Sequence, residues 1–140
     1  DAEITSISEL ESTMVGAVVG SPLSSPDLQV SGHVQNTTPL SGGNEMFWRV
    51  DLSYVDSMTN GFPFTPGQAG VPSANFGYTD EVTKVDLSLG YVTDKWSAVL
   101  YAENAFDDDG YTFIMPQTFF DDRHMTLRPR TVGVRFTLSK

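Results

Sequence analysis

The chain has 140 residues and a mass of 15.3 kDa, so it holds material for one domain at most. Its 8 basic and 18 acidic residues give a net charge of −10, which excludes binding to nucleic acid or to anionic lipid through a basic patch. Because cysteine is missing from the sequence, thiol catalysis, disulfides and cysteine-ligated zinc are excluded as well.

Two further classes are excluded by hydropathy and composition. No stretch approaches the roughly 18 unbroken apolar residues of a membrane-spanning helix. An aromatic content of 11%, with abundant Val and Leu, is too high for a disordered chain. The opening residues lack the basic start and apolar core of a signal peptide, so we expect the chain to begin after processing or inside a larger protein.

The first third of the chain contains three weak patterns. Asp1–Ser6 is a candidate short strand. Ile7–Val19 spaces apolar residues four apart but includes glycine and several β-branched residues, so we expect a loop that contains about a turn of helix. Leu28–Thr38 alternates weakly between polar and apolar positions and predicts a strand, with His33 on its polar side.

Three later segments alternate cleanly and predict strands with one apolar and one polar face: Met46–Tyr54, Lys84–Tyr91 and Thr131–Leu138. Another strand is expected at Trp96–Asn104, which is apolar on both sides except for Ser97 and Glu103. The apolar face comprises Trp48, Val50, Leu52, Tyr54, Val85, Leu87, Leu89, Tyr91, Val132, Val134 and Phe136, and the charged positions opposite are Arg49, Asp51, Lys84, Asp86, Glu103 and Arg135.

Strand length and connection length point to a membrane barrel. The clean runs match the roughly 9–11 residues of a tilted membrane strand better than the about 5–6 of an ordinary strand. Leu40–Asn44 and Thr93–Lys95 are short turns, whereas Ile7–Asp27, Thr59–Glu81 and Asp107–Arg130 are long links. Outer-membrane barrels alternate short periplasmic turns with long extracellular loops, and all charge in the clean strands avoids the apolar face, as contact with lipid requires.

A family resemblance supports this interpretation. Trp96–Asp107, which reads WSAVLYAENAFD, resembles the penultimate strand of TonB-dependent outer-membrane receptors, and Arg128–Phe136 resembles their last strand. Pro22–Asp27, leading into a strand that ends at Pro39-Leu40, resembles an earlier hairpin of the same family. The resemblance extends over nearly the whole chain, roughly Asp1 to Phe136. Each motif alone is a weak match, and the resemblance rests on the order and spacing of the motifs together.

The resemblance implies a C-terminal segment, residues 1–140, of a barrel of about 22 strands with a plug in its lumen. Plug and earlier strands are not in the sequence. The implied partners are the remainder of the barrel with its plug, the TonB complex, the barrel-assembly machinery, outer-membrane lipid and a small nutrient, and the implied location is the bacterial outer membrane. Gly133, Phe136 and Leu138 resemble the C-terminal signal that the assembly machinery reads, although Ser139-Lys140 follow where many such proteins end on an aromatic residue.

The long links supply the candidate ligand contacts. Aromatic side chains beside Gly and Pro can line a vestibule, and in this family extracellular loops help to capture siderophores, cobalamin or glycans. The alternative is that these rings only pack the links together. The candidate substrate-binding residues are Phe62, Phe64, Tyr78, Tyr111, Phe113, Phe120 and His124.

We expect no enzyme and no resident cofactor. Neither histidine belongs to a catalytic or zinc motif, and no nucleophile elbow or phosphate loop occurs. Asp107, Asp108 and Asp109 precede a glycine and form a calcium candidate, but they lack the spacing of a calcium-binding EF-hand loop, and a turn-capping role for Asp107 is favoured.

The sequence therefore predicts an all-β, antiparallel, long-stranded transmembrane barrel segment of about six strands from a nutrient receptor. Six strands leave two open edges, which need pairing partners. Two alternatives remain: a receptor-derived fragment that assembles with itself through those edges, and a soluble β-sandwich that acts as a binding module.

Overall fold

The computed structural model describes residues 2–74, 76–115 and 123–139, and these residues are mostly antiparallel β structure. They form two compact units. The first, which we call the link unit, comprises Asp1–Gln29, Val55–Val82 and Gly110–Thr126; the second, the sheet unit, comprises Val30–Tyr54, Thr83–Asp109 and Leu127–Lys140. The link unit thus contains most of the predicted long links.

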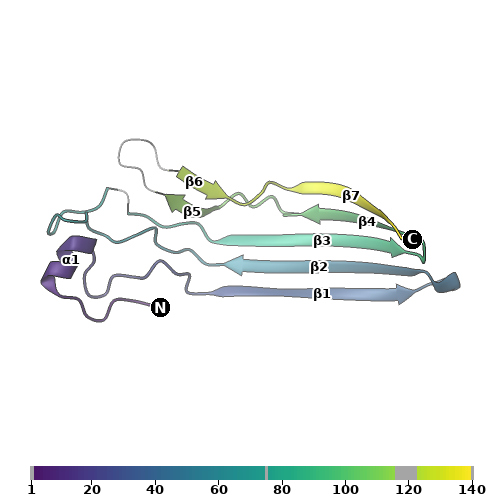
Figure 1. Ribbon diagram of the computed structural model, residues 1–140, viewed down its shortest axis with the longest axis horizontal. Helices are drawn as coiled ribbons and strands as arrows, with labels where there is room; N and C mark the ends of the chain where they lie inside the picture. Colours follow the sequence, from purple (N-terminus) through teal and green to yellow (C-terminus); the bar gives the residue numbers. More distant parts are fainter. Residues whose placement is uncertain (1, 75, 116–122, 140) are drawn as a thin grey trace. The chain divides into compact units, whose positions relative to one another are not determined.

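One five-stranded sheet makes up the sheet unit, and Figure 1 shows its long strands side by side. The strands are β1 Gln29–Pro39, β2 Glu45–Val55, β3 Val82–Val92, β4 Trp96–Glu103 and β7 Thr131–Leu138, in the spatial order β1-β2-β3-β4-β7. All five predicted long strands are confirmed and differ from the expectation only at their ends. The first three have 11 residues each, whereas β4 and β7 have 8.

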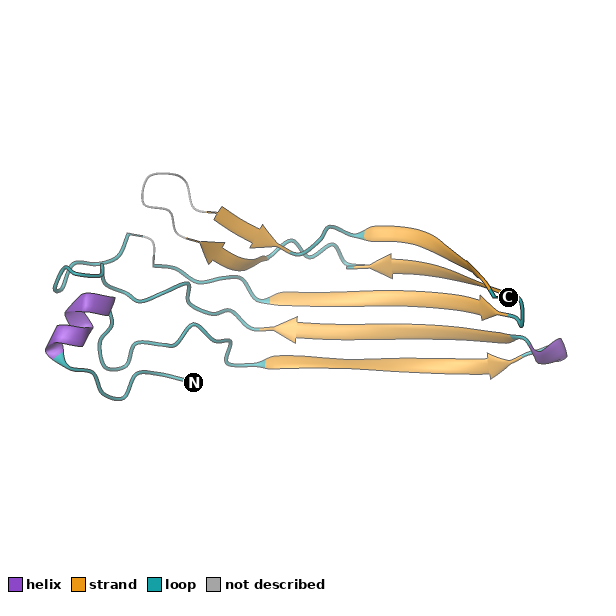
Figure 2. Cartoon of the chain, in the orientation of Figure 1, coloured by secondary structure: helices purple, strands orange, loops and turns teal. Residues whose placement is uncertain are grey.

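The two short turns lie at the same end of the sheet (Figure 2). The first contains the 3-10 turn η1, Ser41–Gly43, in which both glycines adopt positive φ. The second is closed by Thr93, whose backbone N–H donates to the Trp96 carbonyl at 2.9 Å and whose hydroxyl accepts from the Trp96 N–H at 3.0 Å. The long links therefore join strand ends at the opposite end of the sheet.

Strand register shows that the apolar and polar faces are continuous over β3, β4 and β7. Leu89 pairs with Leu100, and Leu100 pairs with Val134, so these three side chains share one face. On the other face Glu103 pairs with Thr131 and Val99 pairs with Arg135. The order leaves β1 and β7 as edge strands, and the described strands form no closed barrel.

The described residues build almost no hydrophobic core. Only Ala17, Val82 and Ile114 are buried among their hydrophobic side chains. The apolar face of the sheet is exposed instead, with Leu87 at 41% and Leu138 at 75% marking the range of its large exposed side chains. No helix within the described ranges is long and apolar enough to cross a membrane.

Three expectations about the links are wrong in detail. Residues 2–6 form no strand; Ile4 pairs instead with Gly20 and Ser21 through backbone bonds of 2.8 and 3.0 Å. The Ile7–Val19 segment contains a helix, α1 Glu9–Val15, of nearly two turns. The third link is not structureless, because β5 Tyr111–Met115 pairs with β6 Arg123–Thr126 in a separate two-stranded sheet.

A capping box explains why α1 forms despite its weak pattern. The Ser8 hydroxyl accepts from the Glu11 N–H, and the Glu11 carboxylate accepts from the Ser8 N–H. The Ser8 hydroxyl and N–H also hold the pKa of Glu11 below its ordinary value. This contribution to stability is therefore present above about pH 4.5 and is lost as the pH falls through the lowered pKa.

Candidate functional site

The polar face carries its charges as ion pairs along single strands. Arg49 pairs with Asp51 on β2, with Nε donating to the carboxylate at 2.7 Å, and Lys84 pairs with Asp86 on β3. Both pairs are half-buried. In each pair the partners are two residues apart on the same side of one strand, so these ion pairs run along the strands and not across them.

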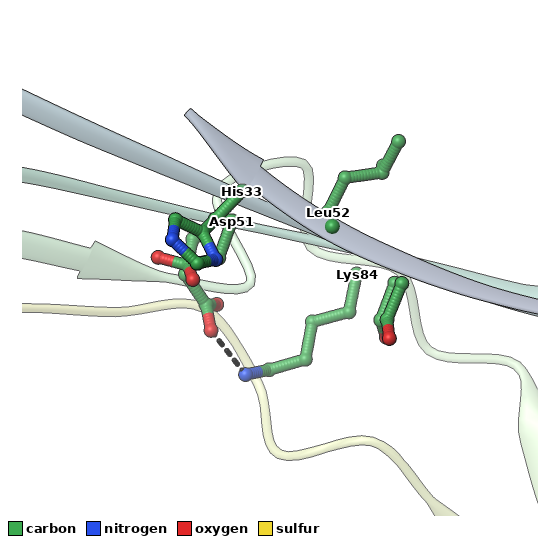
Figure 3. Close-up of a pocket in the computed structure, with 8 residues that line it drawn as sticks. His33, Asp51, Leu52 and Lys84 are labelled. Atoms are coloured by element: carbon green, nitrogen blue, oxygen red, sulfur yellow. Dashed lines mark hydrogen bonds and ion pairs between the residues drawn. The ribbon is translucent and has the colours of Figure 1, made fainter. Parts of the chain in front are cut away.

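A hollow of about 340 Å³ lies on this face over β1, β2 and β3. His33, Asp51, Lys84 and Asp86 contribute its polar lining from three adjacent strands. Figure 3 shows His33 beside Asp51, whereas Leu52 points to the other side of the sheet. The hollow therefore presents imidazole, ammonium and carboxylate groups together, which suits a polar solute or a polar protein surface.

Two aromatic rings on the polar face lie over glycines of the neighbouring strand. Phe47 covers Gly90, and Tyr101 covers Gly133, so closely that a Cβ at either glycine would overlap the ring. The Arg135 guanidinium in turn lies 5.5 Å from the centre of the Tyr101 ring. These contacts pin the register of β2 against β3 and of β4 against β7, because a shifted strand would place a side chain under the ring.

Replacing Gly90 with alanine is expected to destabilise the sheet by about 1–3 kcal/mol, because the Phe47 ring must leave its position. Gly32→Ala is the matched control, since a Cβ at Gly32 meets nothing within 4 Å. Urea unfolding of Gly90→Ala, Phe47→Ala and the double variant measures the coupling between the two residues. Additive losses would contradict the contact.

Asn104 organises the far end of β4 and is only 1% exposed. Its side-chain amide donates to the carbonyls of Asp108 and Arg128, both at 2.9 Å, and its side-chain oxygen accepts from the Asp108 N–H at 3.0 Å. Its own N–H donates to the Asp86 carboxylate at 2.8 Å. This residue thereby joins the end of β4 to the segment that enters β7.

The aspartates that follow Asn104 serve the same turn. The Asp107 carboxylate accepts from the Arg130 N–H at 2.7 Å, and the Asp108 carboxylate accepts from the Thr83 N–H at 2.8 Å. Asp107 thus holds the segment that enters β7, and its turn-capping role stays a prediction. Within the described ranges no group of three or more His, Asp or Glu residues is arranged to hold a metal ion, so the calcium candidate at Asp107, Asp108 and Asp109 gains no support.

The exposed apolar face ends in an aromatic cluster near the short turns. The Trp96 ring lies 5.5 Å from Tyr91 and is stacked at 5.7 Å on Phe136, measured between ring centres. Farther along the face, Trp48, Val50, Leu87, Leu89, Leu100 and Val132 line a shallow hollow of about 330 Å³ whose surface is almost wholly apolar. The predicted apolar positions therefore do form one continuous surface across β2, β3, β4 and β7.

Backbone contacts tie the three long links together in the link unit. The Phe64 N–H donates to the Gly16 carbonyl at 3.0 Å, and the Gly67 N–H donates to the Thr13 carbonyl at 2.8 Å. Asp80 and Tyr111 join the second and third links through bonds of 3.0 and 2.8 Å. The links are thus one folded assembly rather than three independent loops.

Gly16→Ala is expected to break the contact between α1 and Phe64, because the added Cβ would overlap the Phe64 carbonyl. Gly16 also has a φ of 76°, where alanine costs roughly 1–2 kcal/mol. Gly20→Ala separates the two causes, since Gly20 has a φ of 84° but open space around its Cβ position. Amide hydrogen exchange at Phe64 should accelerate only in Gly16→Ala; equal acceleration in both variants would assign the effect to strain.

The predicted substrate-binding aromatics do not converge on one point. Tyr111 and His124 face each other across the β5–β6 pair, with ring centres 4.3 Å apart, and Phe113 is exposed on β5. Tyr78 is exposed and contacts Phe76 edge-on at 5.7 Å. Phe64 lines a small hollow beside α1, Phe62 is half-buried, and Phe120 lies outside the described residues. Their ligand role stays a prediction.

Comparisons with protein-family models, with curated proteins and with solved structures each find no match. The argument about function therefore rests on the residues and the geometry of this chain.

Proposed function

We propose that the sheet unit is a stretch of the wall of an outer-membrane β-barrel, and that the chain is part of a TonB-dependent receptor for energy-coupled uptake of a scarce nutrient. The carrying observation is the apolar face, which extends over adjacent strands, is exposed, and has no charged residue at any described strand position. Monomeric soluble proteins seldom expose apolar patches beyond about 300–600 Å². Contact with lipid removes the whole apolar face from water.

Several independent features support a membrane wall over an ordinary sheet. The inner strands β2, β3 and β4 have hydrogen-bonded neighbours on both sides, which hydrocarbon demands of any spanning structure. The Tyr91–Trp96–Phe136 cluster, close to the short turns, has the composition of an interfacial aromatic girdle, which supports the proposal. The opposite face is polar and hollowed around Asp51 and Lys84, as suits an aqueous lumen. The edges of β1 and β7 are then paired by further strands.

Receptor function would also fix the orientation of the sheet in the membrane. The short turns belong on the periplasmic side, and the link unit belongs on the extracellular side, where it meets the nutrient. The polar face contributes side chains to the lumen, where plug and solute pass. The family resemblance of Trp96–Asp107 and Arg128–Phe136 supports a receptor over other barrels.

Single cysteines test the membrane placement without background, since the sequence contains none. In intact cells a membrane-impermeant maleimide should label Gln68→Cys, in the link unit, and should not label Asp94→Cys, in a short turn. Val134→Cys should react only with a lipid-soluble maleimide. Labelling of all three by the impermeant reagent would refute the proposal.

The self-assembling fragment is a second candidate, favoured by the two edge strands β1 and β7. The size of the native species in detergent-extracted membranes separates the two. A polypeptide of several hundred residues that contains this sequence supports the receptor, whereas a 15.3 kDa chain in a regular oligomer supports self-assembly. The soluble β-sandwich stays an alternative; among the described residues of the sheet unit, the apolar face carries no second sheet.

A further inference from the structure

The shallow hollow of about 330 Å³ on the apolar face is formed around a small side chain. Ala102 on β4 pairs with Leu87 on β3 and with Val132 on β7, so all three side chains belong to the apolar face. Alanine is the smallest of the residues that line the hollow, and it lies between two larger ones. The hollow is therefore a notch at a defined position and not a general property of the face.

The width of the notch follows from the strand order. Leu87 and Val132 belong to strands separated by β4. Neighbouring strands lie about 4.7–4.9 Å apart, so the two backbones are about 10 Å apart. The Leu87 and Val132 side chains occupy part of that distance. The remaining width suits one unbranched hydrocarbon chain and is too small for a ring or a branched chain.

The hollow extends across several strands. Membrane-barrel strands tilt by about 35–45°, so a lipid chain that follows the membrane normal has to cross neighbouring strands. A hollow that belonged to one strand would not match that path. The apolar lining comes from all four strands of the face: Trp48 and Val50 on β2, Leu87 and Leu89 on β3, Leu100 and Ala102 on β4, and Val132 on β7.

The chemistry of the lining selects a hydrocarbon. Its surface is almost wholly apolar, and no charged residue occupies a described strand position on this face. A polar ligand would give up hydrogen bonds to water and gain none here. A hydrocarbon chain would gain dispersion contacts with the walls without such a loss.

We propose that this hollow holds one unbranched acyl chain of a membrane lipid, with Ala102 beneath the chain and Leu87 and Val132 on either side. The inference rests on the proposed function, because the face must first be in contact with lipid. It goes beyond general contact with lipid, since it assigns one chain to one position and states which chains fit there.

Trp48 lines the hollow and can report on the chain that occupies it. In Trp96→Phe it is the only tryptophan. This variant of the full chain is folded into vesicles of phosphatidylcholine brominated on the acyl chains, and unbrominated phosphatidylcholine is mixed in as a competitor. One competitor has straight chains, and the other has the methyl-branched chains of diphytanoyl-phosphatidylcholine. The straight chains should relieve the quenching of Trp48 about threefold more effectively, because branches keep a chain away from the walls.

Ala102→Leu fills the hollow and should abolish this preference. Leu138→Phe is the matched control, because it adds the same number of carbon atoms to an exposed position at the other end of β7 and should leave the preference unchanged. The fraction of folded protein is measured for each variant. The comparison of the two competitors needs no change at Ala102, so it stands even where Ala102→Leu folds poorly.

The outcomes separate this inference from the proposed function. Strong quenching by brominated lipid that both competitors relieve equally would overturn the acyl-chain site and leave the contact with lipid intact. A preference that persists in Ala102→Leu would place the selective position elsewhere and overturn the site as well. No quenching of Trp48 by brominated lipid would overturn the site and the proposed function together.

Discussion

Replacing Asn104 with alanine is expected to lower the free energy of unfolding by about 3 kcal/mol, because three side-chain hydrogen bonds disappear in a buried turn. The carbonyls of Asp108 and Arg128 and the Asp108 N–H each lose a partner. Asn104 also has a φ of 49°, a conformation that alanine adopts less readily than asparagine. Urea unfolding in detergent measures the loss.

Asn104→Asp is a second variant for the same experiment and removes only the donor hydrogens of the side chain. Aspartate is nearly isosteric but lacks the amide hydrogens, so its carboxylate would face two carbonyl oxygens. We expect it to be at least as destabilising as alanine. Asn36→Ala is the control on exposed β1 and should stay within about 0.5 kcal/mol of wild type. Similar small losses for all three variants would show that Asn104 does not organise the turn.

Placing arginine on the apolar face at Leu87 is expected to cost about 2–4 kcal/mol in a lipid bilayer, since a cation would enter the hydrocarbon near mid-strand. Ser88→Arg is the matched control, because Ser88 is the next residue along β3 and belongs to the polar face, opposite Tyr101. The fraction of protein that folds into vesicles reports the difference. Leu87→Arg should fold poorly, and Ser88→Arg should fold nearly as wild type.

The reverse ranking, or equal folding of both variants, would contradict a lipid-facing surface. A water-exposed sheet would accept arginine at Leu87 readily, because surface substitutions away from special contacts usually change stability by less than about 0.5 kcal/mol. The pair of variants therefore separates contact with lipid from simple exposure to water.

The long strands could be predicted from sequence because their periodicity is complete. β2, β3 and β7 alternate between apolar and polar residues over nearly their whole length. Such a sequence gathers its apolar side chains on one face only when the chain is an extended strand. The turn residues then indicated where the strands end. The Leu40–Asn44 and Thr93–Lys95 segments left too few residues for anything but antiparallel neighbours.

The links were harder to predict because their structure depends on partners distant in sequence. β5 and β6 are short, and a register shift between Tyr111 and Phe113 disturbs their alternation. The helix α1 had a readable signal, the Ser8–Glu11 capping box, which the glycine and β-branched residues of the segment obscured. The candidate strand at residues 2–6 failed because its backbone pairs with residues 20–23 instead of with a strand.

For the candidate sites, the sequence predicted on which face of the sheet each residue lies, but not which residues it contacts. Alternation separated Asp51 and Lys84 from the apolar residues, but which charges pair depends on side-chain reach along each strand. The burial of Asn104 was not readable either, since it follows from bonds to residues up to 24 positions away. The rings that cover Gly90 and Gly133 could be inferred from one feature of the sequence, a glycine within an alternating strand.

The central claim is that the apolar face contacts lipid, and native tryptophan fluorescence tests it most directly. The chain has only two tryptophans, Trp48 and Trp96, and both belong to that face. In vesicles that contain phospholipid brominated on the acyl chains, the emission of both should be quenched, and aqueous acrylamide should have little effect. Strong quenching by acrylamide, with no response to brominated lipid, would contradict the account.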